Sequence, residues 1–224
     1  GVMLKKKNIE TKFVQGLRIT DKETVKIVEE VLANEINKEI VNSINETGGK
    51  AIGLAGNRDN LIKASKLKVS VRETDSNIEK MLDIGFVGEP IKMNSEFILD
   101  KLQKGYIPVI APLGNDNSNN YNINADTVAG FIAGELKASK LLLLTDVAGI
   151  LNEEKKLISS LSLKESKELF NKKVIEGGMK PKILTCIKAM EKGVAKSTIL
   201  DGRIPHALIL ELFTEHGIGT QIYS

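Results

Sequence analysis

Residues 141–150 read LLLLTDVAGI, an unbroken apolar run that ends in Thr145-Asp146 and a turn of small residues. A strand that is apolar at every position is buried on both faces, which is typical of a parallel sheet covered by helices. Segments with strand-like and helix-like patterns alternate on either side of this run. The sequence therefore predicts an α/β fold, a three-layer αβα sandwich with a mainly parallel central sheet.

The same reading along the chain predicts the other elements. Helices are expected where apolar residues recur at three- and four-residue intervals, over residues 21–46, 94–104, 126–138, 164–170, 181–192 and 207–213. Strands are expected over residues 51–56, 66–73, 84–88, 107–112, 197–200 and 220–223. The most polar segment, NDNSNNYNIN at 115–124, is predicted to be a loop. Because such sheets bind ligands at the carboxyl ends of strands, the loops after strands are where function is expected.

Composition excludes several classes of protein. The 224 residues carry a net charge of +3 with 4% aromatics and no dense basic stripe, so a dedicated nucleic-acid binder is not expected. One Cys excludes an intramolecular disulfide and a multi-Cys zinc site, and two His leave little for a His-based metal site. These counts fit a reducing cytosol, so we expect a cytoplasmic protein. No apolar run approaches the roughly 18 residues of a membrane span.

Two groups of polar residues flank predicted helix starts. Arg18 precedes the helix that begins at Thr20 or Asp21, where it can hold a carboxylate with two hydrogen bonds. The alternative for Arg18 is a surface ion pair with a nearby acid. In Tyr121-Asn122-Ile123-Asn124-Ala125-Asp126, the asparagines can both donate and accept hydrogen bonds. For Asp126, an ordinary N-cap is an equally good interpretation.

Two further groups suit a nucleotide. Thr145-Asp146 and the small-residue turn after them are what a pocket at a sheet edge needs, although a cap and turn explain them too. Gly177-Gly178 lets backbone N–H groups approach an anion. Lys182 then falls in the first turn of a helix, where a positive charge is unfavourable unless a phosphate binds there. The alternative interpretation is a flexible loop whose lysines are solvated. Together the four groups fit phosphoryl transfer, in which a protein positions reactants and neutralises charge.

Five stretches together resemble the acetylglutamate kinases of the amino acid kinase family, in the same order and over essentially the whole chain. They are GLRITDKETV (16–25), YNINADTVAGFIAGEL (121–136), LLLLTDVAGIL (141–151), GGMKPK (177–182) and DGRIPHALILELFTEHGIGT (201–220). Each stretch alone is less specific, because carbamate, aspartate, glutamate 5- and uridylate kinases share the fold and parts of the TD-x-x-G signature.

The resemblance implies ATP-dependent phosphorylation of the side-chain carboxylate of N-acetyl-L-glutamate, a step toward arginine. It implies that Lys182 stabilises the transferring phosphoryl group, that Asp126 organises the catalytic lysines, and that Mg²⁺ rides on the ATP phosphates. The residues implied to hold N-acetyl-L-glutamate are Arg18, Asn122 and Asn124. Those implied to lie beside the nucleotide are Thr145, Asp146, Gly149, Ile150, Glu176, Gly177, Gly178 and Met179.

The resemblance also divides the chain. Residues 1–138 would form the amino-acid-substrate lobe, incomplete at its start, and residues 139–224 the ATP-binding lobe. The family carries a Lys-x-Gly-Gly strand end and a His-Gly-Gly-Gly loop ahead of the GLRxTD motif, and neither is present here. We therefore expect the native chain to be longer, and these 224 residues alone to be inactive and poorly folded.

The C-terminal stretch is similar to that of arginine-inhibited members of the family. The matching residues are His206, Glu211 and the stretch Gly217-Ile218-Gly219-Thr220, in which Gly217 and Gly219 form the Gly-rich turn. Glu211 would meet a guanidinium, and carbonyls of the Gly loop would accept from it; an ordinary helix, turn and strand is the alternative. The resemblance implies a homo-oligomer, a dimer or a hexamer. The alternatives for function are carbamate, aspartate or glutamate 5-kinase activity, or a non-catalytic module that binds arginine or a nucleotide.

Overall fold

The structure is a computed structural model. It describes residues 12–14, 17–72, 79–172, 175, 177–215 and 217–224. The chain divides into two compact units, Gly1–Ala125 and Asp126–Ser224. The lobes expected from sequence, 1–138 and 139–224, are defined by what each would bind, and they stay a prediction.

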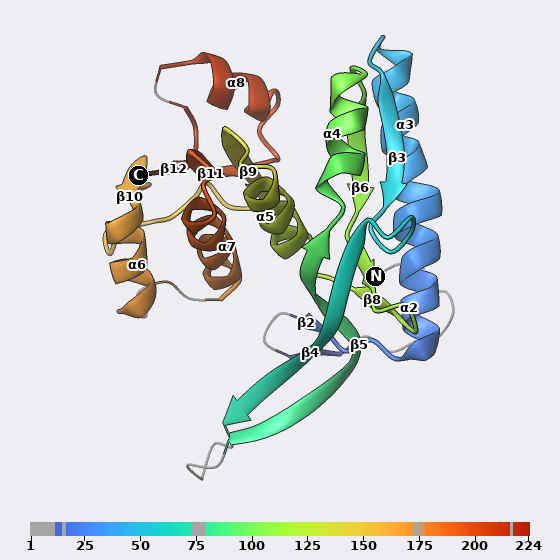
Figure 1. Ribbon diagram of the computed structural model, residues 1–224. Coiled ribbons are helices and arrows are strands. Elements are labelled where there is room, and N and C mark those ends of the chain that lie inside the picture. The colour runs from blue at the N-terminus through green and yellow to red at the C-terminus, as the bar shows by residue number, and fades with distance from the viewer. Residues whose placement is uncertain (1–11, 15–16, 73–78, 173–174, 176, 216) are drawn as a thin grey trace. The chain divides into compact units, whose positions relative to one another are not determined.

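In the first unit, a long helical run packs on a parallel strand pair. The run comprises α2 (Lys22–Glu29), the π-helix η1 (Glu30–Ile36) and α3 (Asn37–Glu46), so the helix predicted over 21–46 is confirmed, although its π segment was not foreseen. Strands β3 (Ala51–Ala55) and β6 (Ile107–Ala111) pair in parallel. Figure 1 shows α3 on one side of this pair and α4 (Ser95–Gln103) on the other. Helix, sheet and helix thus form the three layers that the sequence predicts.

A buried amide attaches the helical run to these strands. Asn37, which is 6% exposed, donates from Nδ2 to the carbonyl oxygens of Val109 at 2.8 Å and Leu54 at 3.4 Å. Gly53 leaves the room for it, because a Cβ there would lie 2.2 Å from Asn37 Oδ1. The close approach therefore requires glycine on the strand and an amide on the helix.

The rest of the first unit is a small ring of strands. Long β4 (Ile62–Arg72) and β5 (Glu79–Met93) form an antiparallel hairpin, and β7 (Leu113–Asn115) and β8 (Asn120–Asn122) close the ring. Short β1 (Phe13–Val14) and β2 (Leu17–Arg18) pair with each other.

One prediction was wrong in this ring, because the segment 115–124 is not all loop. Asp116 Oδ1 accepts from the backbone N–H groups of Ser118 and Asn119 and closes a tight turn. Tyr121 is buried and donates its hydroxyl to Asp116 Oδ2 at 2.6 Å. The polar residues thus build the turn of a β7–β8 hairpin.

The second unit is a four-stranded sheet in the order β10-β12-β11-β9. Its strands are β9 (Lys140–Thr145), β10 (Ser160–Ser162), β11 (Lys196–Asp201) and β12 (Thr220–Tyr223). The β9–β11 and β10–β12 pairs are parallel, and β12 runs antiparallel to β11.

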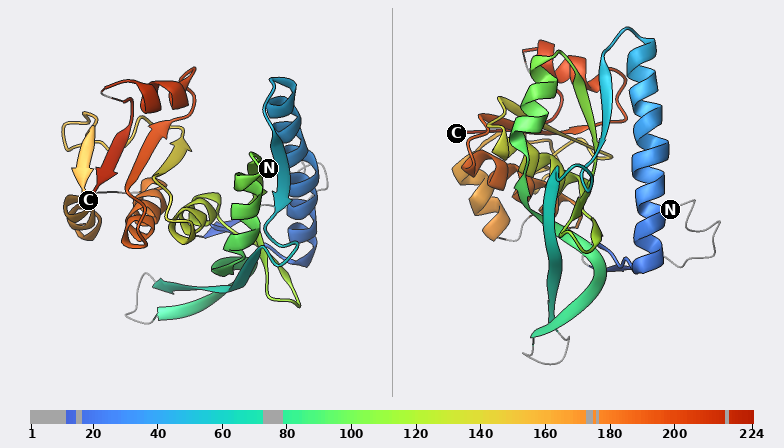
Figure 2. Two further views of the ribbon diagram at one scale, coloured as in Figure 1. Left: turned by 45° about the horizontal axis from the view of Figure 1, so that its top comes forward. Right: turned by 45° about the vertical axis from the view of Figure 1, so that its right-hand side comes forward.

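Helices cover both faces of this sheet. Figures 1 and 2 show α5 (Ala125–Glu135), α6 (Leu163–Asn171) and α7 (Met179–Glu191) on one face and α8 (Ala207–Phe213) on the other. The predicted apolar run is confirmed as β9, with Leu141 and Leu143 in the core beside Ile183 and Ile199. Helix α7 starts at Met179, two residues earlier than predicted, because Pro181 is tolerated in a first turn. No described helix has the length and apolarity to cross a membrane.

Candidate active site

A close crossing of α5 and α7 positions the two residues that the sequence singled out as catalytic. A Cβ built on Gly130 of α5 would lie 2.4 Å from Thr185 Cγ2 of α7. Asp126 lies one turn before Gly130, and Lys182 lies three residues before Thr185. The absence of a side chain at Gly130 thus lets the first turns of both helices come together.

Lys182 and Asp126 form an ion pair at this crossing. Lys182 Nζ lies 2.9 Å from Asp126 Oδ2, and the two side chains are 17% and 19% exposed. The N-cap of α7, Gly178, makes no side-chain cap hydrogen bond, and no acidic residue lies in the first turn. Backbone N–H groups and a positive side chain therefore meet at one helix start, the combination that favours a phosphate. Asp126 offsets the unfavourable position of the lysine near the positive helix end.

A cavity of about 520 Å³ opens at this helix start and at the carboxyl end of β9. It brings together Thr145, Asp146, Gly149, Ile150, Gly178, Met179 and Lys182, all of them predicted site residues. Val147, Leu151 and Ile175 also line it and were not predicted. Gly177 is exposed and is not part of the lining, and Glu176 lies outside the described residues. The wall combines apolar side chains with a cationic end, as a nucleotide requires.

The turn after β9 is held by residues distant in sequence. Gly149 has φ +146°, and a Cβ there would lie 2.6 Å from Thr220 Oγ1. The N–H of Ile150 donates to Thr220 Oγ1 at 2.8 Å, and its carbonyl accepts from the N–H of Ile158 at 2.8 Å. The shape of the cavity wall therefore depends on Thr220, a residue that the sequence did not mark as part of this site.

The neighbouring strand end adds a charged pair that sequence reasoning missed. Asp201 ends β11 directly beside Thr145 in the parallel register. Its carboxylate accepts from Arg203 Nε at 2.9 Å and from Nη2 at 2.7 Å, and these bonds lower the pKa of Asp201 to about 2. Asp146 also helps to raise the pKa of Arg203, after the larger effect of Asp201. Ligands of such sheets bind at the carboxyl ends of strands. Applying this rule to β11, as was done for β9, would have identified Asp201 and Arg203.

The predicted substrate residues lie in the first unit. Asn122 Nδ2 is 3.5 Å from Thr20 Oγ1, and that buried hydroxyl donates to the carbonyl of Arg18 at 2.9 Å. The Arg18 guanidinium lies 4.9 Å from the centre of the Phe13 ring. Thr20 thus connects the Asn122 side chain to the Arg18 backbone, whereas the Arg18 guanidinium lies against Phe13. Asn124 is half-buried and lies just before α5.

The residues predicted to bind arginine are only partly together. Glu211, Gly217 and Gly219 line a second cavity of about 250 Å³, together with Ser159, Ser160, Thr214, Glu215 and Gln221. Glu211 is 9% exposed, and its Oε2 accepts from the N–H of Ile218 at 2.9 Å. His206 does not line this cavity; it is exposed, with φ 60°, and precedes α8.

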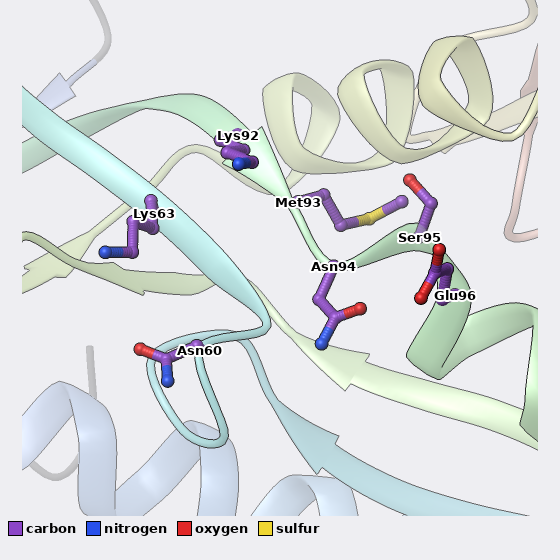
Figure 3. Close-up of a pocket in the computed structure, with 7 residues that line it drawn as sticks. All are labelled: Asn60, Lys63, Lys92, Met93, Asn94, Ser95 and Glu96. Atoms are coloured by element: carbon purple, nitrogen blue, oxygen red, sulfur yellow. The ribbon is translucent and has the colours of Figure 1, made fainter.

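A third cavity, of about 480 Å³, lies in the first unit between the β4–β5 hairpin and the start of α4 (Figure 3). Lys63 and Lys92 are direct partners across the hairpin and both line it. Lys63 Nζ is 3.3 Å from Asn117 Oδ1, and the lining also contains the carboxylate of Glu96. With its charges mixed in this way, the cavity selects no ligand class, and we assign it none.

Comparison with known proteins agrees with this geometry. The amino acid kinase family model matches residues 1–201. The chain belongs to the amino acid kinase family. It is 55% identical over 224 residues to an acetylglutamate kinase of Parvibaculum lavamentivorans and 52% identical over 223 residues to one of Rhodospirillum centenum. Each match covers 99% of this chain and 73% of the relative. The chain is therefore a kinase of this family.

A solved structure supports the same fold. N-acetylglutamate synthase from Neisseria gonorrhoeae, complexed with coenzyme A and N-acetyl-glutamate, matches 100% of this chain and 49% of its own, with a TM-score of 0.83. At 24% sequence identity this likeness speaks for the fold alone. The α/β prediction is thus confirmed both by the described strands and helices and by the family.

Proposed function

We propose that the chain catalyses transfer of the γ-phosphoryl group of ATP to the side-chain carboxylate of N-acetyl-L-glutamate. The observation that carries the proposal is the Lys182–Asp126 ion pair, whose lysine lies at the start of α7 and lines the 520 Å³ cavity. The names of the relatives at 52% and 55% identity support the choice of acceptor.

In the proposed reaction, an oxygen of the acceptor carboxylate attacks the γ-phosphorus and the bond to the β–γ bridging oxygen breaks. The products are an acyl phosphate and ADP. Lys182 neutralises charge on the transferring group and the bridging oxygen, and the N–H groups that open α7 add donors. Asp126 holds the ammonium in place, so that little reorganisation is needed during transfer.

The remaining site residues have proposed roles that follow from their surroundings. Thr145, Asp146, Gly149 and Ile150 would bind the nucleotide together with Gly178 and Met179, all of which line this cavity. Mg²⁺ bound to the phosphates would neutralise their charge, held largely by phosphate oxygens and water, and Asp146 is the cavity carboxylate suited to it. In the first unit, Arg18 would grip a carboxylate of the acceptor while Asn122 and Asn124 bind its amide region.

We also propose that arginine inhibits the enzyme at the 250 Å³ cavity. Glu211 and Glu215 line the cavity, and Gly217 and Gly219 line it too without side chains of their own. A guanidinium has five donors that suit carboxylate and carbonyl oxygens. Titration of wild type and Glu211→Ala with arginine tests this: equal affinity would refute the assignment.

Assembly and location are proposals too. Ile36 and Ile40 leave 41% and 44% of their surface exposed on the long helical run, which supports contact with a second copy in a homo-oligomer. A cytoplasmic location is proposed because ATP and the precursors of amino acids are cytoplasmic substrates.

The test is a panel of acceptors, using protein expressed from its complete native reading frame. N-acetyl-L-glutamate, L-glutamate, L-aspartate and carbamate are compared by ADP release, and the acyl phosphate is trapped with hydroxylamine. We expect trapping with N-acetyl-L-glutamate alone. Preference for another acceptor would replace the proposal with that kinase activity, and binding without turnover would favour a non-catalytic module.

Variants connect the activity to the geometry. Lys182→Met removes the charge at the helix start and should lower kcat by about 10² to 10³, the size seen when one preorganised donor is lost. Lys180→Met is the matched control, since Lys180 is an exposed lysine of the same turn outside the cavity lining. Equal kcat for both variants would contradict the role of Lys182.

A further inference from the structure

The start of β12 is connected to both cavities of the second unit. Gly219 and Gln221 line the 250 Å³ cavity. Thr220 lies between these two residues, Ile222 follows them, and both are 0% exposed. This alternation is expected because neighbouring side chains of a strand point to opposite faces. Thr220 therefore lies between two residues that line one cavity, and its hydroxyl bonds Ile150, which lines the other.

The hydroxyl of Thr220 holds the turn of the nucleotide cavity. It lies 2.8 Å from the N–H of Ile150 and would be 2.6 Å from a Cβ on Gly149. Because Gly149 has φ +146°, the turn adopts a conformation that most residues avoid, and the hydrogen bond stabilises it. The bond is buried, so an unpaired Ile150 N–H would be costly and the turn would move to satisfy it.

A second contact fixes the other end of the same segment. Glu211 Oε2 accepts from the N–H of Ile218, and a Cβ on Gly217 would lie 2.6 Å from that oxygen. A Cβ on Gly219 would lie 2.3 Å from the carbonyl oxygen of Ile199, so the chain lies tightly against β11 just before Thr220. The position of the Thr220 hydroxyl therefore depends on three contacts: the pairing of Thr220 with Ile199 of β11, the packing of Gly219, and the bond of Glu211 to Ile218.

We infer that Thr220 is a positioning residue for nucleotide binding and that it couples the Glu211 cavity to the turn at Gly149-Ile150. A change at Glu211 moves the 217–219 segment, the Thr220 hydroxyl moves with it, and the turn loses its anchor. The inference rests on the proposed function only in taking the 520 Å³ cavity as the nucleotide site.

Direct binding of ADP, measured by calorimetry, tests this without any acceptor. Thr220→Val keeps the shape of the side chain but removes the hydroxyl, and should weaken ADP binding about tenfold. Thr220→Ser restores the hydroxyl and should bind within about twofold of wild type. Thr198→Val, a change at another buried threonine of the same sheet, controls for loss of a buried hydroxyl. Wild-type affinity in Thr220→Val, or no rescue by Thr220→Ser, would overturn the positioning role.

A double-mutant cycle tests the coupling. Glu211→Ala should weaken ADP binding several-fold in wild type and add almost nothing in Thr220→Val, because the anchor is already lost there. Additive effects would overturn the coupling while leaving the positioning role intact.

Hydrogen exchange keeps the test decisive if Thr220→Val does not fold. The Ile150 amide should be protected in wild type and Thr220→Ser and exchange faster in Glu211→Ala; equal exchange in all three would overturn the inference. A wild-type protein that does not bind ADP would refute the proposed function instead, and the exchange experiment would still report on Thr220.

Discussion

Replacing Gly130 by alanine should separate the two helices that carry Lys182 and Asp126. The new methyl group would lie 2.4 Å from Thr185 Cγ2 and 3.3 Å from the Thr185 carbonyl oxygen. Ordinary contact begins at 3.4 Å, so about 1.0 Å of extra separation is needed at the first of these contacts. Neither partner is the end of a long flexible side chain, so the helices themselves must shift.

The expected magnitude follows from two opposing effects. Alanine is favoured over glycine inside a helix by about 1 kcal/mol. Overpacking a tight contact costs about 1–3 kcal/mol. The net change in the free energy of unfolding is a loss of about 0–2 kcal/mol, where an uncrowded site would gain about 1 kcal/mol. The 2.9 Å pair of Lys182 and Asp126 lies next to the crossing, and a shift of this size can lower kcat by up to about 10²-fold.

Urea unfolding and steady-state kinetics measure the two effects together. Gly130→Ala combined with Thr185→Ser removes Cγ2 and should recover most of both losses. Gly134→Ala on the same helix is the control, because its new methyl group meets Lys192 at 2.9 Å near the end of α7, away from the ion pair. If Gly130→Ala proved more stable than wild type with unchanged kcat, the steric account of the crossing would be refuted.

Three further predictions concern buried or hydrogen-bonded groups. Asn37→Asp puts a buried carboxylate against two carbonyl oxygens and should cost at least about 3 kcal/mol of unfolding free energy. Asn45→Asp also replaces a donor to one carbonyl, that of Ala51, but Asn45 is exposed and its other oxygen still accepts from the N–H of Ala51, so it should cost far less in the same urea titration. The Tyr121 hydroxyl, with the N–H groups of Asn119 and Ser118, lowers the pKa of Asp116 from 3.8 to about 2. The stabilisation by the ionised Asp116 is therefore complete above pH 4 and is lost as pH falls toward 2. Acid unfolding of Asp116→Asn should show a flatter slope there, and an unchanged slope would count against these bonds. Burial raises the pKa of the Cys186 thiol to about 12. Thiol reagents at pH 8 should therefore label Cys186 only when urea unfolds the protein. Rapid labelling of the native protein would contradict the placement of Cys186 in the core.

Local patterns were enough to predict most of the helices and the central strands. The apolar run at 141–144 predicted a buried strand, the spacing of apolar residues over 21–46 predicted a long helix, and both predictions are confirmed. What the sequence could not predict depends on partners far along the chain. The turn between β7 and β8 is polar, and the hairpin is held by Asp116, which closes the turn, and by the burial of Leu113 and Tyr121. Polarity alone therefore misled the prediction for 115–124.

The candidate site, too, contains residues that a local pattern predicts and residues that it does not. Lys182 and Thr145-Asp146 stood out because a lysine at a helix start and a polar pair after an apolar strand are unusual locally. Thr220 carries no such signal, since a threonine at the start of a strand is ordinary. Its importance comes from a hydrogen bond to a residue 70 positions earlier in the chain. Residues that bind a ligand can thus be read from local chemistry, whereas those that hold the binding residues in place become visible only when the strands are assembled.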